Sequence, residues 1–297
     1  MQIAPIALFV YNRPQHVRYC IESLQKNFFA DKSELFIFSD GAKDCGQEKN
    51  VRSVREYIRN IRGFKRLHIV EQPENKGLAS NIISGVTDLV EKYGRVIVLE
   101  DDLIVSPWFL TFMNEALETY KDEESIVNIH LLKGKGTFPE TFLLSFANSW
   151  GWGTWKRGWD LFEPDGKKLL RELEARNLTR KFDFDGAYHF TRMLREQIAG
   201  MNSSWAIRWN ASIFLKGKLS LNSGRSLVTN IGFDGTGTHC DKYGLFATDL
   251  YTGQVKVEKL SLLQENKNAR KMLARIYRFD NSYYNKIRVR ILNFLHR

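Results

Sequence analysis

The first 130 residues alternate between short apolar runs and segments with helical spacing. Apolar runs typical of strands buried on both faces occupy residues 3–10, 34–41, 67–70 and 95–99. Helical spacing is found in residues 15–26, about 47–61, 75–92 and about 107–121, with Val17, Ile21 and Leu24 on one face of the first. This alternation predicts an α/β fold, with a mostly parallel sheet flanked by helices.

The pattern changes after about residue 130. Residues 145–165 are rich in Trp and Gly, residues 165–200 look helical and charged, and residues 203–240 mix apolar runs with Gly. Without internal repeats or a convincing linker, we expect one folded unit over residues 1–255, with halves 1–130 and 131–255. Residues 256–297 are expected to form a separate C-terminal segment.

The C-terminal segment is basic and amphipathic. From Glu265 to Arg297 it has nine Lys or Arg residues and two acidic ones, interleaved with apolar positions. Such a helical appendage lies on an anionic bilayer in some proteins, and in others it packs on the main domain with a solvated basic face. The sequence leaves both possibilities open.

Charge and cysteine content limit the classes of binding partner and the cellular compartment that we expect. The net charge is +10, which serves solubility or an anionic partner such as a nucleotide diphosphate, an acidic membrane surface or nucleic acid. The basic excess lies in the tail, away from the aromatic residues, which disfavours nucleic acid. Three unpaired cysteines fit a reducing compartment, and the N-terminal apolar run is too short for a signal peptide or membrane span. We therefore expect a cytoplasmic protein, with peripheral contact at the inner face of the plasma membrane if the tail binds lipid.

Polar residues follow three of the predicted strands. Arg13 comes after the first, Asp40 after the second, and Glu100, Asp101 and Asp102 after the fourth. Ligands of parallel sheets bind beyond the carboxyl ends of the strands. Three adjacent carboxylates repel one another, and Mn²⁺ or Mg²⁺ relieves that repulsion because hard cations prefer carboxylate oxygens. The alternative is an acidic loop that begins the next helix.

The other strand-end residues suit a nucleotide, although each also has an ordinary structural interpretation. Asp40 can accept a hydrogen bond from a base or ribose, or can be a turn residue. Arg13 can pair with a phosphate, or can hold a loop. Gly77, between Asn75 and Asn81, opens a helix where a nucleotide or sugar could approach the backbone.

Taken together, these motifs resemble the GT-A-type nucleotide-diphospho-sugar transferases. The order is NRP after strand one, SDG after strand two, NKGLASN before a helix and LEDDLIVSPWF after strand four, followed by NSWGWGTW, SWAIRW, NIGFD and GTH. The resemblance covers roughly residues 3–240. It is similar in particular to bacterial sugar transferases of polysaccharide gene clusters and to eukaryotic N-acetylglucosaminyltransferase I.

The resemblance implies a fold and a set of roles. The fold would be GT-A-like, of Rossmann type. Asp102 would bind the metal, with His239 as a further candidate ligand, while Asp101 and Glu100 would hold ribose or donor-sugar hydroxyls. Asp40 and Arg13 would contact the nucleoside, favouring a UDP donor. The donor-binding set is therefore Arg13, Asp40, Asn75, Gly77, Asn81, Glu100, Asp101 and Trp152, the last from the Trp/Gly segment 150–155 that would shape the donor-sugar and acceptor pocket.

One position departs from the family pattern. Relatives usually have an acidic residue, the presumed general base, where this chain has Ser203, and a serine hydroxyl is not basic near neutral pH. The sequence allows four explanations. The alignment can be off by a residue or two, or another carboxylate (Asp234, Asp185 or Asp183) can serve as the base. Alternatively, position 203 has been changed, or the chain is a nucleotide-sugar-binding protein that has lost catalysis.

The expected function is metal-dependent transfer of a sugar from a nucleotide sugar to a hydroxyl of a saccharide or lipid-linked saccharide, with inversion, in bacterial surface polysaccharide or glycan assembly. The alternatives are a nucleotidyltransferase, for which NRPQHVR is a poor phosphate loop, a nucleic-acid-binding protein, and a catalytically impaired nucleotide-sugar-binding protein of the same fold.

Overall fold

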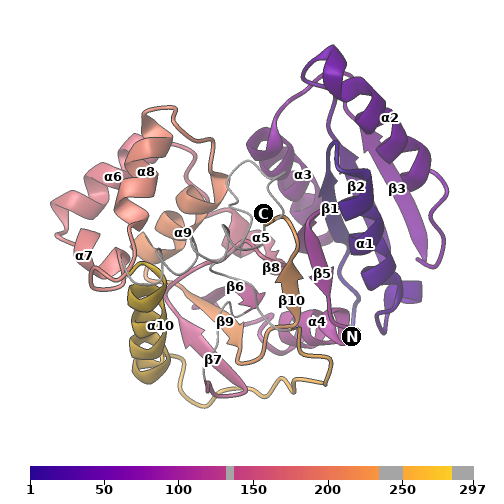
Figure 1. The fold of residues 1–297 in the computed structure, drawn as a ribbon. Helices are drawn as coiled ribbons and strands as arrows, with labels where there is room; N and C mark the ends of the chain where they lie inside the picture. Colours follow the sequence, from indigo (N-terminus) through magenta and orange to yellow (C-terminus); the bar gives the residue numbers. More distant parts are fainter. Residues whose placement is uncertain (132–136, 234–249, 283–297) are drawn as a thin grey trace.

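The computed structural model describes residues 1–131, 137–233 and 250–282. Its first half alternates strands and helices as predicted (Figure 1). The elements in chain order are β1 (Ile6–Val10), α1 (Pro14–Gln25), η1 (Ala30–Lys32), β2 (Glu34–Ser39), α2 (Cys45–Ile58), β3 (Arg66–Glu71), α3 (Leu78–Tyr93), β4 (Arg95–Glu100), β5 (Leu103–Val105) and α4 (Phe109–Thr119).

The second half adds strands to the same sheet and a group of helices beside it. The elements are β6 (Ile126–Leu131), β7 (Thr141–Leu144), β8 (Trp152–Trp155), α5 (Lys156–Trp159), α6 (Gly166–Ala175), α7 (Thr179–Phe182), α8 (Phe190–Ile198), α9 (Trp205–Leu215), β9 (Leu219–Ser223), β10 (Val228–Asn230) and α10 (Lys267–Asp280).

Eight strands form one mixed sheet in the order β3-β2-β1-β4-β8-β6-β9-β7. The pairs among β1, β2, β3 and β4 are parallel, as is β6 with β9, whereas β8 runs antiparallel to both β4 and β6. A separate antiparallel pair joins β5 to β10. The predicted mostly parallel α/β sheet flanked by helices is confirmed, with β8 as the strand that connects its two halves.

Each face of the sheet has its own hydrophobic core. On one face, α1, α2 and α4 pack through residues such as Ile21, Val54 and Phe112. On the other face, α3 packs through Ile82 and Val86 beside a group of tryptophans from β8, α5 and α9. Because β1, β2 and β4 are covered on both sides, their side chains are apolar without alternation, and their polar continuations lie at the strand ends.

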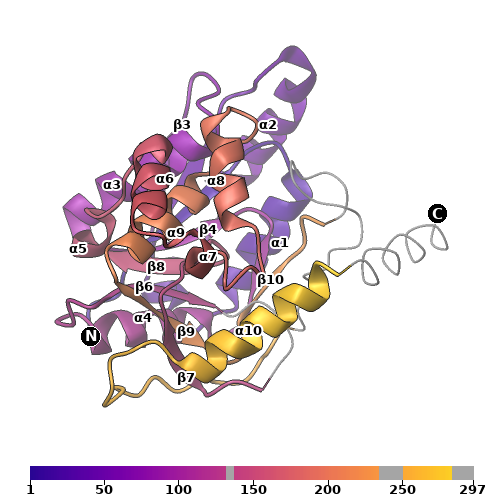
Figure 2. The ribbon, with the colours of Figure 1, turned by 90° about the vertical axis from the view of Figure 1, so that its left-hand side faces the viewer.

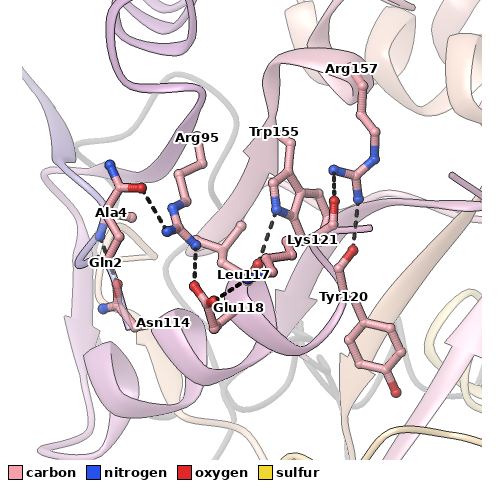
Figure 3. Close-up of polar contacts among 10 residues, drawn as sticks. All are labelled: Gln2, Ala4, Arg95, Asn114, Leu117, Glu118, Tyr120, Lys121, Trp155 and Arg157. Atoms are coloured by element: carbon pink, nitrogen blue, oxygen red, sulfur yellow. Dashed lines mark hydrogen bonds and ion pairs between the residues drawn. The ribbon is translucent and has the colours of Figure 1, made fainter. Parts of the chain in front are cut away.

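Polar contacts join α4 to the N-terminal segment before β1 and to the start of β4 (Figure 3). Arg95 at the start of β4 is buried, and its guanidinium bonds Glu118 of α4 at 3.1 Å and Gln2 at 3.0 Å. The Asn114 Oδ1 accepts a hydrogen bond from the Ala4 backbone N–H at 2.8 Å. These bonds hold α4 under the strands that carry the acidic cluster.

A third core lies in the second half and includes the C-terminal helix. The helices α6, α7, α8 and α9 pack around Phe182, Phe184 and Phe190, and α10 joins them through Leu273 and Tyr277. Both ribbon views place α10 beside β7 (Figures 1 and 2). Residues 267–280 of the predicted basic segment are therefore helical, and the apolar face of this helix packs on the main fold. Residues 283–297 of this segment lie outside the described residues.

Candidate functional site

The acidic cluster lies where β4 ends, next to the residue that follows β1. Since β1 and β4 are parallel neighbours, their carboxyl ends meet at one edge of the sheet. The Arg13 guanidinium forms an ion pair with Asp101 and a second one with Asp102 Oδ2 at 3.2 Å. The Tyr11 backbone N–H donates to Asp101 Oδ2 at 3.4 Å. The predicted strand-end residues Arg13, Asp101 and Asp102 are thus in direct contact.

The single positive charge of Arg13 does not offset the repulsion among the carboxyl groups of Glu100, Asp101 and Asp102. Burial, reinforced by Asp102 and Asp101, raises the pKa of Glu100 to about 8, although Arg13 opposes the shift. Burial also raises the pKa of Asp101 to about 6, although Arg13 opposes this shift too. Burial disfavours the charged form of Arg13, but Asp101 and Asp102 outweigh it and raise the pKa of that side chain. The carboxyl groups at the end of β4 therefore resist full ionisation unless a further cation is present.

The donor set fits a hard divalent cation. Asp101 and Asp102 both pair with Arg13, and Asp102 is the more accessible aspartate, with 15% of its side chain exposed against 5% for Asp101. Within the described part of the chain, no group of three or more His, Cys, Asp or Glu side chains is placed to hold a metal ion by itself. Mg²⁺-type sites usually take one or two carboxylates and complete their shell with substrate phosphates and water. His239, the other predicted ligand, lies outside the described residues.

Asp40 organises a second group of predicted residues. Its Oδ1 accepts the Lys76 N–H at 2.9 Å, and its Oδ2 accepts the Gly77 N–H at 2.9 Å and the Asn75 Nδ2–H at 3.1 Å. Asp40 is 5% exposed, so its carboxylate is used to hold the loop before α3. Asp40, Asn75 and Gly77, all predicted as donor-binding residues, are in contact, but these bonds leave the Asp40 oxygens little capacity for a direct contact with a nucleoside.

The start of α3 depends on a glycine. Gly77 has φ +76°, a conformation that side-chain-bearing residues rarely adopt. Its carbonyl accepts a hydrogen bond from Asn81 Nδ2 at 3.2 Å. Asn81 is 3% exposed, and its Oδ1 is buried without a hydrogen-bond partner among the described residues. The predicted Asn75–Asn81 loop is therefore a fixed turn at the sheet edge.

The segment after β10 covers the acidic cluster. The Ile231 N–H donates to the Asp102 carbonyl oxygen at 2.8 Å. A Cβ at Gly232 would lie 2.6 Å from Asp102 Oδ2 and 3.2 Å from Arg13 Nη1. Only a glycine lets the backbone approach these charged groups so closely. Asn230 Oδ1 lies 3.1 Å from the same Cβ position, and Phe233 is the next residue along the chain.

A cavity of about 580 Å³ begins beside this segment and extends to the helices of the second half. We call it the central cavity. Its polar lining residues are Asn148, Ser149, Glu196, Asn202, Ser204, Asn210 and Asn230. Its aromatic lining residues are Phe146, Trp150, Tyr188, Phe190, Phe233 and Tyr277. The volume is in the usual range of about 300–1,000 Å³ for small-molecule sites.

The predicted catalytic residues are spread over different places. Ser203 is exposed and lines a separate pocket with Ala79 and Arg208. Asp185 has 54% of its side chain exposed, lies 3.6 Å from Arg270 and is not among the described residues that line the central cavity. Asp183 accepts two hydrogen bonds from Thr191 at the start of α8. Asp234 lies outside the described residues.

The position of Trp152 corrects its predicted donor contact. Its side chain is fully buried at 0% exposure, with its ring 5.2 Å from that of Trp205 and 6.0 Å from that of Trp209. In β8 the alternation of side chains directs Trp152 into the core, so it cannot touch a sugar. Its neighbour Trp150 lines the central cavity instead.

Apart from Trp150 of the predicted Trp/Gly segment, the described residues that line the central cavity were not predicted as site residues, and two of them bear on its chemistry. Glu196 is the acidic side chain among the described lining residues, and Asn210 is a buried amide on α9. The helical pattern of residues 165–200 gave no reason to single out Glu196 from the other charges. Asn210 follows the predicted SWAIRW motif directly, but its role depends on a contact with Ala147, 63 positions away.

The chain belongs to glycosyl transferase family 2. The sequence model of that family matches residues 6–190, which span β1, the acidic cluster, β8 and the start of α8. The predicted GT-A relationship is thereby confirmed. No curated protein sequence matches the chain. The comparison with N-acetylglucosaminyltransferase I stays a prediction.

Several solved structures show a distant likeness. Staphylococcus aureus TarS is 18% identical, with 46% of this chain and 24% of TarS covered and a TM-score of 0.31. The mannosyltransferase PcManGT from Pyrobaculum calidifontis, solved with GDP-Man and Mn²⁺, is 11% identical, with 71% and 68% covered and a TM-score of 0.37. A UDP-glucose pyrophosphorylase complexed with UDP-glucose is 12% identical, with 77% and 94% covered and a TM-score of 0.39. The match spans about a quarter of TarS, and none of these likenesses carries residue roles or substrates to this chain.

Proposed function

We propose that the protein transfers a sugar from a UDP-sugar to a hydroxyl of a saccharide or lipid-linked saccharide, with a divalent metal and with inversion, in bacterial surface polysaccharide or glycan assembly. The observation that carries the proposal is the contact of Arg13 with Asp101 and Asp102 beside the central cavity. This contact supports the proposal because the segment that covers it, after β10, also supplies Asn230 and Phe233 to the lining of the central cavity.

In this proposal Asp102 holds the metal, because it combines excess negative charge with the greater exposure. Mn²⁺ or Mg²⁺ would neutralise the charge that develops on the departing diphosphate. Arg13 lies beside the same carboxylates and would pair with a phosphate oxygen. Asp101 and Glu100 would face the ribose or donor sugar, and the loop from Asn75 to Asn81 would bound the nucleotide.

The general base is assigned to Glu196. It is the acidic side chain among the described residues of the central cavity, and its carboxylate bonds only the exposed Arg192 at 2.8 Å within the described structure. A carboxylate in this cavity can take the proton of an acceptor hydroxyl as that hydroxyl attacks the anomeric carbon. Asp234 follows the cavity residue Phe233 and remains the alternative.

A nucleotide-sugar panel tests the proposal. Thermal unfolding is measured with UDP-, GDP- and dTDP-linked sugars, each with and without Mn²⁺, and donor hydrolysis is followed in parallel. We expect Mn²⁺-dependent stabilisation by UDP-sugars together with slow hydrolysis. Stabilisation without turnover under any condition would instead favour the catalytically impaired binder that Ser203 suggests.

A second part of the proposal is contact with an anionic membrane through α10. In the described structure, no helix is both long and apolar enough to cross a bilayer. The apolar face of α10 is occupied by the third core, but its opposite face exposes four cations at helical spacing. These residues, the basic stripe, are Lys267, Lys271, Arg275 and Arg278. Each cation near an anionic surface contributes about 1 kcal/mol.

Liposome cosedimentation tests the basic stripe. Changing all four residues to Glu should abolish binding to phosphatidylserine-containing vesicles and leave donor hydrolysis intact. The control changes four exposed cations on and around α1 and α2 to Glu: Lys26, Lys43, Lys49 and Arg52. Equal losses in both variants would mean that net charge, and not the stripe, drives binding.

A further inference from the structure

Four asparagines line the central cavity, and the carbonyl oxygen of each already accepts a backbone hydrogen bond. The donors are Ser149 N–H to Asn148 at 2.8 Å, Ser204 N–H to Asn202 at 3.0 Å, Ala147 N–H to Asn210 at 2.9 Å and Gly232 N–H to Asn230 at 2.7 Å. Such a bond fixes which end of the amide is oxygen and which is nitrogen. The side-chain N–H groups are thus the ends directed away from the backbone.

Asn210 is the most constrained of the four. It is 3% exposed and lines the cavity from α9. Among the described residues its Nδ2 has no hydrogen-bond acceptor, whereas the Nδ2 of Asn202 donates to the Met193 carbonyl at 3.3 Å. The Asn210 Nδ2 is not among the fully buried polar atoms of the described structure that lack a partner, so it is accessible from the cavity. An oxygen atom of a ligand in the cavity would satisfy the Asn210 N–H.

The rest of the lining suits the two faces of a sugar ring. Trp150 and Phe233 meet edge to face at 5.8 Å, near the acidic cluster. Tyr188, Phe190 and Tyr277 form the opposite end, from α8, its preceding loop and α10. Aromatic rings pack well against the C–H faces of sugars. Burial raises the pKa of Tyr188 and of Tyr277, so both hydroxyls stay neutral.

The charged residues that line the central cavity differ in sign from the net charge of the protein. The protein carries a net charge of +10, yet no Lys or Arg is found among the described lining residues, which include Glu196. Glu196 is paired with the exposed Arg192 at 2.8 Å, and the described lining residues offer no cation of their own to offset the desolvation of an anionic ligand. A neutral ligand rich in hydroxyl oxygens does not carry this cost.

We propose that the central cavity is the acceptor subsite for a neutral sugar unit, and that Asn210 is a specificity-determining residue whose N–H donates to an oxygen of that unit. This inference rests on the proposed function, because the cavity is an acceptor site only if the neighbouring acidic cluster binds the donor. It excludes uronic acids and sugar phosphates as the unit that enters the cavity.

Ligand-observed NMR tests the charge preference. Methyl glycosides of glucose, galactose, mannose and N-acetylglucosamine are compared with methyl glucuronide and glucose 6-phosphate by saturation transfer, all with UDP and Mn²⁺ present. We expect at least one neutral probe to bind, and both anionic probes to bind at least tenfold more weakly than it. An anionic probe that binds as tightly as the best neutral one overturns the proposal, as does the absence of binding by all four neutral probes.

Two variants test Asn210. Asn210→Asp keeps an oxygen for the Ala147 N–H but replaces the donating N–H₂ by an oxygen, and Asn210→Ala removes both. We expect each to lower the affinity for the best neutral probe at least fivefold. The control is Asn60→Ala, at an exposed amide that donates only to the Glu56 carbonyl. Unchanged affinity in either variant, with its thermal unfolding still cooperative, contradicts the role of Asn210.

Donor binding is measured on the same samples, so that a failure of the proposed function can be told apart from a failure of the cavity assignment. If a nucleotide sugar with Mn²⁺ stabilises the protein but no neutral probe binds, the cavity assignment is wrong and the proposed function stands. If neutral probes bind through Asn210 but no nucleotide sugar stabilises the protein, the proposed function is wrong and the cavity is a sugar site of another kind.

Discussion

Arg13 Nη2 lies 3.2 Å from Asp102 Oδ2, although 88 residues lie between these two positions in the sequence. The contact exists because β1 and β4 are parallel neighbours whose carboxyl ends meet at one edge of the sheet. It brings together the cation that we propose for pairing with phosphate and the carboxylate that we propose for binding the metal. The proposed chemistry depends on this pair of strand ends.

Asp102→Asn should remove metal-dependent donor binding. The amide is nearly isosteric but lacks the charge that a divalent cation needs, so we expect the affinity for UDP with Mn²⁺ to fall by about 100-fold, or about 2.7 kcal/mol. Isothermal titration with and without Mn²⁺ measures the loss. Asp122→Asn, on the turn after α4, is the control and should bind as the wild type does. Unchanged affinity in Asp102→Asn would remove Asp102 from the site.

Gly232→Ala should disturb the same site by geometry alone. The added Cβ would lie 2.6 Å from Asp102 Oδ2, so the carboxylate or the covering segment must shift. We expect a tenfold or greater loss of UDP affinity in the presence of Mn²⁺, with a cooperative unfolding transition retained. Gly46→Ala, at an exposed position of α2 whose new Cβ would meet only the Asp44 side chain at 3.2 Å, should leave binding unaltered.

Glu196→Gln should separate catalysis from donor binding. The amide keeps the size of the side chain but cannot take a proton, so we expect turnover to fall by about 10²–10⁴-fold. The affinity for UDP with Mn²⁺ should not change, because Glu196 lines the acceptor end of the cavity. If Asp234→Asn gives the loss and Glu196→Gln does not, the base is Asp234. Ser203→Asp should raise turnover only if position 203 is the vacant base position.

The strand pattern was predictable because the first half of the sheet is buried on both faces. Apolar runs at 34–41 and 95–99 correspond to β2 and β4 within two residues at their ends, and the strand-end positions of Arg13 and Asp101 follow from the parallel order. β8 was not predicted. Its four residues, WGTW, lie in a Trp- and Gly-rich stretch without period, and they pair antiparallel to β4 and β6.

The roles of single residues were less predictable, because they depend on long-range contacts. Asp40 follows a strand as a nucleoside-binding residue would, but its oxygens are taken by the backbone of residues 76 and 77. Trp150 and Trp152 are two positions apart in the sequence. Trp152 packs against Trp205 in the core, whereas Trp150 lines the central cavity. Neither outcome leaves a local signal in the sequence.

The two tryptophans therefore predict opposite phenotypes. Trp152→Ala opens a cavity in the core and should lower the free energy of unfolding by about 3–5 kcal/mol. Trp150→Ala should cost much less stability but should weaken saccharide binding in the central cavity, which its ring lines. Chemical denaturation and the NMR binding assay measure the two effects. A saccharide-specific defect in Trp152→Ala, with normal stability, would contradict its buried position.

Acid should destabilise the fold through His130. Burial lowers the pKa of this histidine from 6.5 to about 4, so the unfolded chain takes up a proton at a higher pH than the folded protein does. The stability present at neutral pH is therefore lost as the pH falls from 6.5 towards 4, and at pH 5 the loss from this one group is about 2 kcal/mol. His130→Gln should remove that part of the difference between pH 7 and pH 5 in chemical denaturation. An identical pH dependence in both proteins would mean that other groups cause it.

The most direct measurement is a crystal structure with UDP and Mn²⁺, with the anomalous signal of manganese used to locate the ion. The account predicts an anomalous peak at the Asp102 carboxylate, with the diphosphate between it and Arg13 and the open side of the site facing the central cavity. A nucleotide bound elsewhere, or a manganese ion away from Asp102, would contradict it.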